Sequence, residues 1–346
     1  MNCVRLGVIG CGKVVSRIHL DALRRVPEAK VVAVADPVPE RRSQAAARAG
    51  RAAAFADWRE LLAYPQLDAV LICTPSAQHS ECALAALALR KHLYIEKPLA
   101  ADPAQAELIV RAWERSGLVA MTGFNYRHHP LSRRLREVVR SGALGRVMTV
   151  RSTFTSAGAW VDDWRKARHM GGGVLLDLAG HHVDLASFVL EQRICEVSAR
   201  LASFHSEQDG AWITAKFEDG PAMQSFFSLC GTDCNRFEVY GEDARLSLDY
   251  FSGTLAVVSR GSGLSERIFS AGRLAASRLK HALTAGRDTS YQAAFSHFVA
   301  GILRRQPVGP DLYDGLQVAQ VVAAAEASAA SGLSCRVTEL AAPARA

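Results

Sequence analysis

The first 124 residues alternate short apolar runs with amphipathic stretches, and this alternation constrains the fold more than any other feature. Stretches with helical spacing separate the runs, and some begin at a capping residue such as Ser76 or Asp102. The apolar runs have the length and composition of buried strands: Val4–Ile9, Lys30–Ala35, Ala69–Ile72, His92–Ile95 and Val119–Gly123. Strands that alternate with helices predict a doubly wound sheet of parallel strands.

The rest of the chain has a different pattern, in which strands follow one another with few helices between them. A chain of 346 residues is long for one hydrophobic core, so we expect two domains, residues 1–124 and 125–346. Strand-like runs in the second are Val147–Phe154, Ile194–Phe204, Ala211–Phe217, Ala222–Leu229, Arg236–Gly241, Ala244–Asp249 and Leu255–Ser259. Consecutive strands joined by short turns predict a largely antiparallel sheet in an α/β domain. The sequence leaves open whether a C-terminal helix packs back on the first domain.

Composition and charge exclude several classes of protein. Apolar residues make up 49% of the chain and charged residues 22%, which is typical of soluble globular proteins. No uncharged stretch is long enough for a membrane span, and the first predicted strand leaves no room for a signal peptide, so we expect a cytoplasmic protein. The net charge of +7 is spread out, and the densest basic run, Arg133–Arg140, is typical of a solvated helix face. The eight scattered cysteines form no CxxC pair, which favours reduced thiols without a metal. We expect neither a nucleic acid nor a membrane as partner.

A glycine pair follows the first predicted strand and opens the first helix. In Gly10-Cys11-Gly12-Lys13-Val14 the glycines permit a tight turn and the close approach of a pyrophosphate, and the helix start supplies amide donors. We therefore expect Gly10, Gly12, Lys13 and Val14 to contact a dinucleotide. The third position of the fingerprint is Val15 instead of glycine or alanine, which predicts slightly wider packing between helix and strand.

An acidic residue, Asp36, ends the second predicted strand, where a carboxylate can bind the ribose hydroxyls of a dinucleotide. Because it would repel a 2′-phosphate, NAD is favoured over NADP. Arg41 either lies on a solvated helix face or stacks on the adenine. Thr74 and Pro75 close the next strand and should border the cofactor. His79 is either structural or a neighbour of the cofactor, and His19 is interpreted as a packing residue.

Three side chains suggest hydride-transfer chemistry. Lys97 follows the strand His92–Ile95, so its ammonium should point into the crevice where such sheets bind ligands. Asp177 and His181 are four residues apart and share a face if the segment is helical. His181 could act as general base, with Asp177 binding substrate and Lys97 stabilising an alkoxide. Alternatives are a surface lysine, a helix-terminal aspartate and a register in which His182 is the active histidine.

The chain resembles the family of glucose–fructose oxidoreductase, inositol 2-dehydrogenase and rhizopine catabolism proteins. The likeness spans roughly residues 4–190. It is carried by Gly10-Cys11-Gly12, Asp36, Cys73-Thr74-Pro75 with His79, Glu96-Lys97-Pro98, Gly123-Phe124-Asn125-Tyr126-Arg127, Trp164-Arg165, and Gly171-Gly172-Gly173 through Asp177 and His181 to Asp184. The glutamate-lysine-proline and triple-glycine elements in this order are highly specific.

The resemblance implies a fold, a chemistry and an assembly. The fold would be a Rossmann domain followed by an α/β domain with a large, open, predominantly antiparallel sheet, through which members form dimers or tetramers. Lys97 would be the catalytic lysine, His181 the proton-transfer residue and Asp177 a contact of the reacting region. The substrate would be a sugar or cyclitol.

We expect cofactor contacts for Glu96 and Lys97. Asn125 and Arg127 follow the strand Val119–Gly123 and should lie at the rim of the crevice, where Asn125 contacts the cofactor or the substrate. Arg127, Trp164 and Arg165 are candidates for binding substrate hydroxyls, and for each of these residues a purely structural role is the alternative.

Four activities fit these residues. The leading one is an NAD-dependent dehydrogenase of a sugar, sugar derivative or cyclitol. The second is an NADPH-dependent ketoreductase of a nucleotide-linked keto sugar, which Asp36 disfavours. The third retains NAD in a closed redox cycle. The fourth is a dinucleotide-sensing regulator without activity, for which Lys97, Asp177 and His181 would be dispensable.

Overall fold

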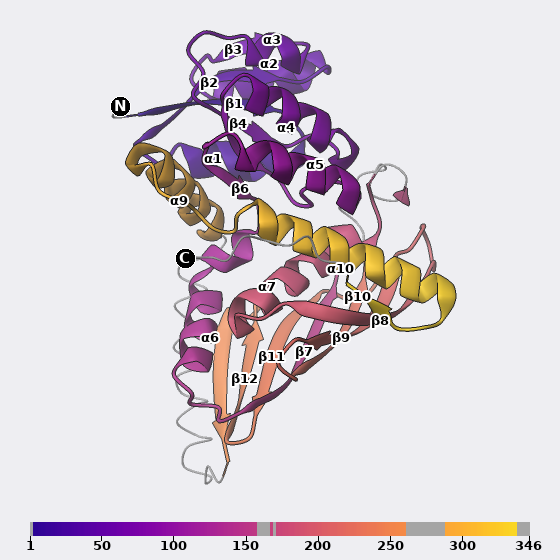
Figure 1. Cartoon of the computed structure of the whole chain (residues 1–346). Coiled ribbons are helices and arrows are strands. Elements are labelled where there is room, and N and C mark those ends of the chain that lie inside the picture. Colours follow the sequence, from indigo (N-terminus) through magenta and orange to yellow (C-terminus); the bar gives the residue numbers. More distant parts are fainter. Residues whose placement is uncertain (1–2, 158–166, 169–170, 261–287, 338–346) are drawn as a thin grey trace. The chain divides into compact units, whose positions relative to one another are not determined.

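The structure is a computed structural model, and it describes residues 3–157, 167–168, 171–260 and 288–337 (Figure 1). These residues form two compact units. Among the described residues, unit 1 contains 3–128 and 289–319, and unit 2 contains 129–157, 167–168, 171–260, 288 and 320–337. The two segments 289–319 and 320–337 show that the C-terminal part of the chain contributes to both units.

Unit 1 is built on a six-stranded parallel sheet in the order β3-β2-β1-β4-β5-β6. The order places the first strand beside the second and the fourth, as in a doubly wound sheet. The strands are β1 (Val4–Ile9), β2 (Ala29–Ala35), β3 (Ala53–Phe55), β4 (Ala69–Ile72), β5 (His92–Ile95) and β6 (Ala120–Thr122). The predicted Rossmann-type sheet is therefore confirmed, and within this sheet the sequence pattern missed the short edge strand β3.

Helices cover both faces of this sheet. On one face, α3 (Trp58–Leu62), α4 (His79–Ala88), α5 (Pro103–Glu114) and the start of α10 (Leu312–Ser331) form one apolar core with the strands. On the other face, a second core includes η1 (Val15–His19), α1 (Leu20–Leu23), α2 (Pro39–Arg48) and α9 (Ser290–Arg304). Because strands of such a sheet are covered by apolar residues on both faces, β4 is hydrophobic throughout, and β1 is interrupted only by Arg5.

The segment α9 comes from the far end of the sequence, yet it packs within the core of unit 1. Its Phe295 and Phe298 are fully buried, and their rings lie 4.9 and 5.8 Å from the ring of Tyr94 in β5. Burying a side chain of this size stabilises a fold by roughly 1.5–3 kcal/mol. Unit 1 therefore depends on residues more than 150 positions beyond the last strand of its sheet.

Unit 2 is built on an eight-stranded sheet in the order β13-β12-β11-β7-β10-β9-β8-β14. Its strands are β7 (Val147–Thr155), β8 (Ile194–Ala202), β9 (Gly210–Phe217), β10 (Ala222–Ser228), β11 (Cys234–Gly241), β12 (Ala244–Asp249), β13 (Thr254–Ser259) and β14 (Cys335–Arg336). All neighbours are antiparallel except β7 and β10. The predicted antiparallel sheet is confirmed, with the correction that β7 inserts between β10 and β11, so these two do not form a hairpin.

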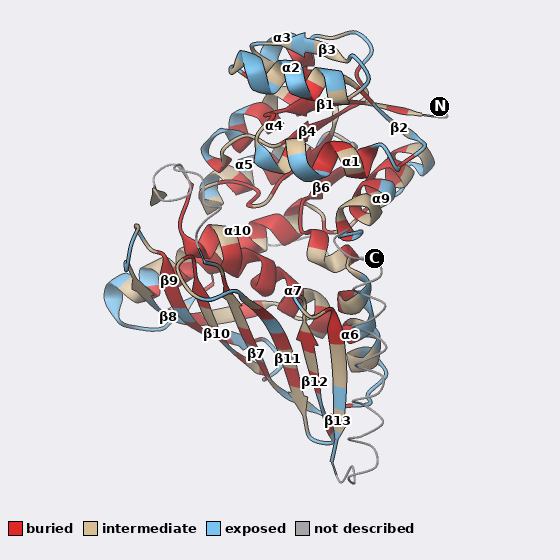
Figure 2. Ribbon diagram, turned by 180° about the vertical axis from the view of Figure 1, so that it is seen from behind, coloured by how far each residue is buried: buried red, intermediate tan, exposed pale blue. Residues whose placement is uncertain are grey.

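The helices that the structure describes in unit 2 include α6 (Pro130–Arg140), the continuous segment of η6 (Leu175–Ala179) and α7 (Gly180–Leu190), and the part of α10 from residue 320 onward. Figure 2 shows α7 almost wholly buried, and eight of its residues are buried. The η6 segment is a π-helical turn, as is η1 in unit 1. Single π turns inside helices are frequent at functional sites. Within the residues that the model describes, no helix is long and apolar enough to cross a membrane.

Candidate active site

Backbone hydrogen bonds continue the parallel sheet one residue past the strand ends and bring the sequence motifs together. The amide of Gly10 donates to Ala35 at 2.8 Å, and that of Cys73 donates to Ile9 at 2.7 Å. Further along the same edge, Glu96 N–H donates to Ile72 at 2.9 Å, and Gly123 N–H donates to Ile95 at 2.7 Å. Because all the strands are parallel, the residues after Ile9, Ala35, Ile72, Ile95 and Thr122 share one edge. This is the edge at which doubly wound sheets bind ligands.

The two glycines of the first loop have different structural roles. Gly10 has a φ of +88°, and a Cβ added to it would lie 2.6 Å from the carbonyl oxygen of Cys73. Only glycine fits this close approach of two strand ends. Gly12 has open space where its Cβ would be, with no atom within 4 Å. We call this open space beside Gly12 the Gly12 cradle. The helix begins directly after Gly12, and the first turn of a helix has amides that are not bonded within the helix itself. Lys13 is exposed and Val14 is half-buried.

Asp36 holds the glycine loop in place. Its carboxylate accepts hydrogen bonds from the amide of Cys11 at 2.8 Å and from the amide of Val38 at 2.9 Å. The side chain is buried, with 6% of its surface exposed. Arg42 donates to the carbonyl of Asp36 at 2.9 Å, whereas Arg41 is exposed to solvent. The loop that follows β1 is thus fixed by the residue that the sequence assigns to the ribose.

His79 connects the loops after β4 and β5. Its ring is buried, with Nδ1 2.8 Å from the carbonyl oxygen of Pro98 and Nε2 2.9 Å from that of Thr74. Burial lowers the pKa of His79 although both carbonyls favour its protonated form. A neutral ring has one N–H and can donate to one carbonyl at a time. Of the two roles left open for His79, the structural one matches these contacts, because both ring nitrogens face backbone carbonyls.

The hydroxyl of Thr74 is the clearest sign of a missing ligand at this edge. Its Oγ1 is buried and has no hydrogen-bond partner among the described residues. Buried polar groups are nearly always paired, and an exception indicates an absent ligand or water. Together with the open cradle at Gly12 and the helix that begins after it, this buried oxygen fits a bound dinucleotide.

A buried His–Glu pair lies behind Lys97, and the sequence did not predict it. His19 Nε2 is 3.0 Å from Glu96 Oε1, and the amide of Lys97 donates to Glu96 Oε2 at 3.2 Å. Burial by itself would raise the pKa of Glu96, but His19 and the charge of Lys97 outweigh it and hold that pKa below its usual value. His19 is fully buried, so it packs in the core, as expected, and also anchors the carboxylate next to Lys97.

Cys73 completes a Cys–His–Glu arrangement, because its Sγ lies 3.6 Å from Nδ1 of His19. A thiol nucleophile needs its thiolate form. Burial raises the pKa of Cys73 well above its usual value, with further increases from Glu96 and Cys11. Cys73 therefore remains a thiol that donates to the imidazole, and the arrangement positions Glu96 without nucleophilic chemistry.

Two candidates after β6 are tied to the C-terminal segments of unit 1. Asn125 is buried, and its Nδ2 donates to Ser290 Oγ at 2.8 Å. Arg127 donates to Asp314 Oδ2 at 3.1 Å, and little of either side chain is exposed. Both belong to η3 (Asn125–His128), and their contacts explain why α9 and the start of α10 belong to this unit. A role for Arg127 in substrate binding would have to coexist with this ion pair.

The motif that runs from the triple glycine to His181 lies in unit 2. Gly171 and Gly173 have φ values of +83° and +93°, which glycine adopts without strain. They lead into η6, which contains the half-buried Asp177, and α7, in which His181 is 9% exposed. The π turn between Leu175 and Ala179 widens the helix, so the spacing of Asp177 and His181 is not that of a regular α-helix. Trp164 and Arg165 lie outside the described residues.

His182 belongs to the core of unit 2. It is fully buried among Phe154, Phe227 and Phe237, and its Nε2 lies 3.0 Å from Asn235 Oδ1. Burial lowers its pKa to about 4, although the hydrogen bond to Asn235 opposes the shift. The alternative in which His182 is the active histidine therefore loses support, since its ring is enclosed by the apolar side of the sheet.

The buried His182 makes a testable contribution to acid stability. Its folded pKa of about 4 is below the unfolded value, so the unfolded chain binds more protons between about pH 6.5 and 4. The stability that this group contributes is complete above the unfolded pKa and decreases as the pH falls, by about 3 kcal/mol once the pH is below the folded pKa. Urea unfolding at several pH values gives the free energy of unfolding as a function of pH. Between about pH 6.5 and 4 this free energy should fall less steeply for His182→Gln than for the wild type. Identical slopes for both proteins would contradict this assignment.

Comparison with known proteins agrees with this geometry. A model described as the oxidoreductase family with an NAD-binding Rossmann fold matches residues 4–124, and the GFO/IDH/MocA C-terminal domain matches residues 132–247. The chain belongs to the GFO/IDH/MocA oxidoreductase family. The two matched segments correspond closely to the parallel sheet and to most of the second sheet. The resemblance drawn from the motifs is confirmed.

Similar proteins of the GFO/IDH/MocA family span most of the chain. Myo-inositol 2-dehydrogenase of Thermotoga maritima is 28% identical over 75% of this chain and 79% of its own length. dTDP-3,4-didehydro-2,6-dideoxy-alpha-D-glucose 3-reductase of Actinomadura kijaniata is 30% identical over 71% of this chain and 74% of its own. The crystal structure of an oxidoreductase domain protein from Kribbella flavida is 26% identical, covers 98% of this chain and all of that one, and has a TM-score of 0.87.

Proposed function

We propose that this member of the GFO/IDH/MocA family is an NAD-dependent dehydrogenase of a sugar, sugar derivative or cyclitol. It would transfer a hydride between the nicotinamide and a secondary alcohol or ketone. The observation that carries the proposal is the position of Lys97, directly after β5 on the edge that also carries the Gly12 cradle. The names of the similar proteins, an inositol dehydrogenase and a keto-sugar reductase, support the substrate class.

In the proposed mechanism the bound NAD supplies the hydride acceptor, and the chain supplies orientation and proton transfer. The ammonium of Lys97 would bind the reacting hydroxyl oxygen and stabilise the negative charge that develops there. A ring nitrogen of His181 would accept the hydroxyl proton, and Asp177 would hold a neighbouring hydroxyl by a hydrogen bond. In the reverse direction Lys97 would polarise the ketone and His181 would return the proton.

Glu96 and Asp36 have supporting roles in this mechanism. Glu96 accepts from the amide of Lys97 and is itself held by His19, so the backbone from which the lysine projects is fixed. Asp36 fixes the glycine loop through Cys11 N–H, and its remaining acceptor capacity can bind ribose hydroxyls. A 2′-phosphate beside this buried carboxylate would be repelled, which favours NAD over NADP.

The proposal is tested by reduction of the cofactor with a panel of substrates. Purified protein is incubated with NAD or with NADP and a panel of inositols, hexoses, anhydrosugars and sugar acids, and absorbance is followed at the reduced nicotinamide band. We expect activity with at least one polyol, and a higher kcat/KM with NAD than with NADP. Binding of NADH without turnover of any compound of the panel, in either direction, would contradict the proposal and favour a dinucleotide-sensing regulator without activity.

The second candidate, reduction of a nucleotide-linked keto sugar, is favoured by one observation. Of the two relatives compared above, the dTDP-keto-sugar reductase has the higher sequence identity to this chain, 30% against 28%. The same panel separates the two functions if it includes a dTDP-linked keto sugar with NADPH. Higher kcat/KM in that arm than in any NAD arm would establish the reductase.

We also propose that the chain self-associates through the open face of the unit 2 sheet. On this face Trp212 is 41% exposed, and its ring lies 5.2 Å from that of Phe226 on the neighbouring strand. Exposed aromatic clusters on a sheet face are typical of protein interfaces. This supports a dimer or tetramer in which the two aromatic rings become buried.

Replacing Trp212 by glutamate should dissociate this assembly. A buried carboxylate without a partner is strongly unfavourable at an interface. Light scattering after gel filtration should give a multiple of the chain mass for the wild type and a lower mass for Trp212→Glu. Phe251→Glu is the control, because Phe251 is an aromatic residue that is more exposed than Trp212, at 57%, and lies in the turn after β12. A monomeric wild type, or equal masses for Trp212→Glu and the wild type, would contradict the proposal.

A further inference from the structure

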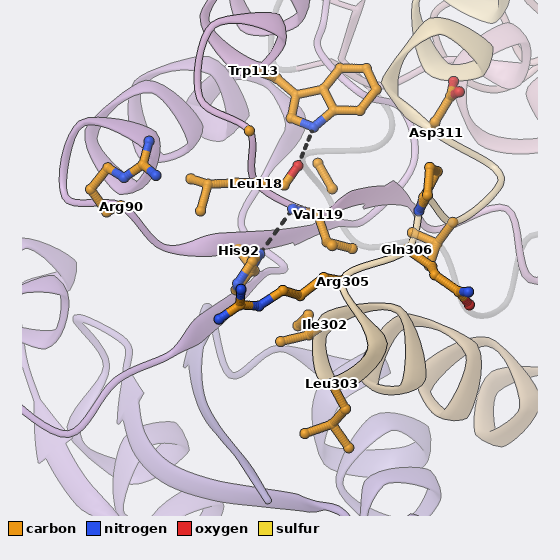
Figure 3. Close-up of a pocket in the computed structure, with 14 residues that line it drawn as sticks. Arg90, His92, Trp113, Leu118, Val119, Ile302, Leu303, Arg305, Gln306 and Asp311 are labelled. Atoms are coloured by element: carbon orange, nitrogen blue, oxygen red, sulfur yellow. Dashed lines mark hydrogen bonds between the residues drawn. The ribbon is translucent and has the colours of Figure 1, made fainter. Parts of the chain in front are cut away.

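Unit 1 contains a cavity of about 700 Å³ at the opposite edge of the parallel sheet from the glycine loop. Its walls come from the beginnings of β5 and β6, the turns after α4 and α5, and the segment that follows α9 (Figure 3). Buried and half-buried apolar residues such as Ile302, Val308 and Leu118 form much of its lining, and the exposed polar side chains in it are those of Arg90, Arg305 and Gln306. A concave site with an apolar base and a few polar groups is the general form of a small-molecule site.

Two arginines that line this cavity adopt a backbone conformation that normally belongs to glycine. Arg90 has a φ of +58° at the end of α4, and Arg305 has a φ of +56° at the end of α9. At each helix end, the amides of the arginine and of the residue after it donate to carbonyl groups of the last turns. In α9, Arg305 N–H donates to the carbonyl of Ile302 at 3.3 Å, and Gln306 N–H donates to that of Gly301 at 2.9 Å. This hydrogen-bond pattern is a helix stop in which glycine is the favoured residue. The stop itself therefore does not explain an arginine at both positions.

The helix dipole does not explain Arg305 either. Arg304 in the last turn of α9 already places a cation at the negative end of that helix. The guanidinium of Arg305 forms no hydrogen bond or ion pair with any part of the chain that the structure describes. In Figure 3 its side chain extends from the end of α9 toward His92 at the start of β5. Arg90, by contrast, donates to the carbonyl of Ser116 at 2.5 Å.

The remaining polar groups of the cavity also favour an anion. Nδ1 of His92 accepts from the amide of Val119 at 2.9 Å, so the neutral ring carries its proton on Nε2 and can donate it. Burial lowers the pKa of His92, which keeps the ring neutral near pH 7. The carboxylate of Asp311 is occupied at the start of α10, where it accepts from the amides of Tyr313 and Asp314 at 2.9 and 3.1 Å. The cavity thus presents donors and uncommitted positive charge.

We propose that this cavity binds the carboxylate or phosphate group of a small metabolite, with Arg305 as the principal ligand. A guanidinium binds either oxyanion through two parallel hydrogen bonds, and such charge-assisted bonds are stronger than neutral ones. Nε2–H of His92, toward which the Arg305 side chain extends in Figure 3, is the further donor beside it. The site is separate from the dinucleotide edge and does not depend on the proposed activity.

The test is isothermal titration calorimetry on the protein saturated with NADH, so that the dinucleotide site cannot bind the probe. Inorganic phosphate and succinate are titrated separately, because they distinguish a phosphate from a carboxylate. We expect at least one probe to bind with a Kd below about 20 mM, and Arg305→Gly to weaken it about tenfold or more. Glycine suits the backbone at this position, so the variant should fold; its melting temperature checks this.

Arg51→Gly is the matched control. Arg51 also has a positive φ, +67°, and carries the same charge, but it does not line the cavity. Its replacement should leave the Kd within about twofold of the wild type. Three results would overturn the proposal: neither probe binds, Arg305→Gly binds as tightly as the wild type, or Arg51→Gly weakens binding as much as Arg305→Gly does.

Discussion

Replacing Lys97 by alanine is expected to lower kcat by about a thousandfold or more while the Kd for NADH changes by less than about threefold. The reason lies in where the positive charge acts. In the proposed mechanism it is needed most when the substrate oxygen becomes negative, so its loss affects the transition state more than the ground state. Stopped-flow or steady-state kinetics with the best substrate of the panel, combined with NADH fluorescence titration, measures both quantities.

Lys91→Ala is the matched control for this experiment. Lys91 immediately precedes β5, at the opposite end of the strand, and its Nζ donates to the carbonyl of Leu67 at 2.8 Å. The variant loses the same side chain and charge away from the proposed site, so its kcat should stay within about twofold of the wild type. Near-normal turnover of Lys97→Ala, or an equal loss in Lys91→Ala, would reject the role assigned to Lys97.

Replacing Gly10 by alanine is expected to destabilise unit 1 by about 3 kcal/mol or more. The added Cβ would meet the backbone of Cys73 at 2.6 Å, and the backbone φ of +88° is itself unfavourable for any residue with a side chain. Neither strand end can move freely, because Asp36 and the hydrogen bond from Cys73 to Ile9 hold them. Urea unfolding followed by circular dichroism measures the loss.

Gly12→Ala is the informative partner of Gly10→Ala. The Cβ of this variant would enter open space, so the fold and its melting temperature should be nearly unchanged. The same space is where the pyrophosphate is expected, so the affinity for NADH should fall about tenfold or more. A Gly12→Ala protein that binds NADH normally would contradict the proposed cofactor position, and a stable Gly10→Ala protein would contradict the packing argument.

The sequence was sufficient to predict most elements of the fold, because both sheets follow strong local patterns. The runs of β1, β4 and β5 are mostly apolar, and β8 to β10 and β11 to β13 are separated by recognisable turns. β3 was missed because Ala-Ala-Phe is short and has no β-branched residue. The parallel pairing of β7 with β10 was also missed, since it joins segments about 70 residues apart and no local signal specifies such a contact.

The candidate site was predictable in its motifs and not in its contacts. Gly10, Asp36 and Lys97 could be placed at one edge, because each follows a strand of a parallel sheet. The pair of His19 with Glu96 and the pair of Arg127 with Asp314 depend on tertiary packing between distant segments. His182 was distinguished from His181 only by the structure, which places His182 against Asn235 and three phenylalanines.

We propose that Lys97 and His181 act on the same substrate oxygen. The most direct measurement is a crystal structure of the protein with NADH and the preferred polyol of the panel. We predict that Lys97 Nζ and one ring nitrogen of His181 both lie within about 3.2 Å of the hydroxyl carried by the carbon that faces the nicotinamide. A complex in which either group is beyond hydrogen-bonding reach of that oxygen, or in which the dinucleotide lies away from Gly12, would contradict the claim.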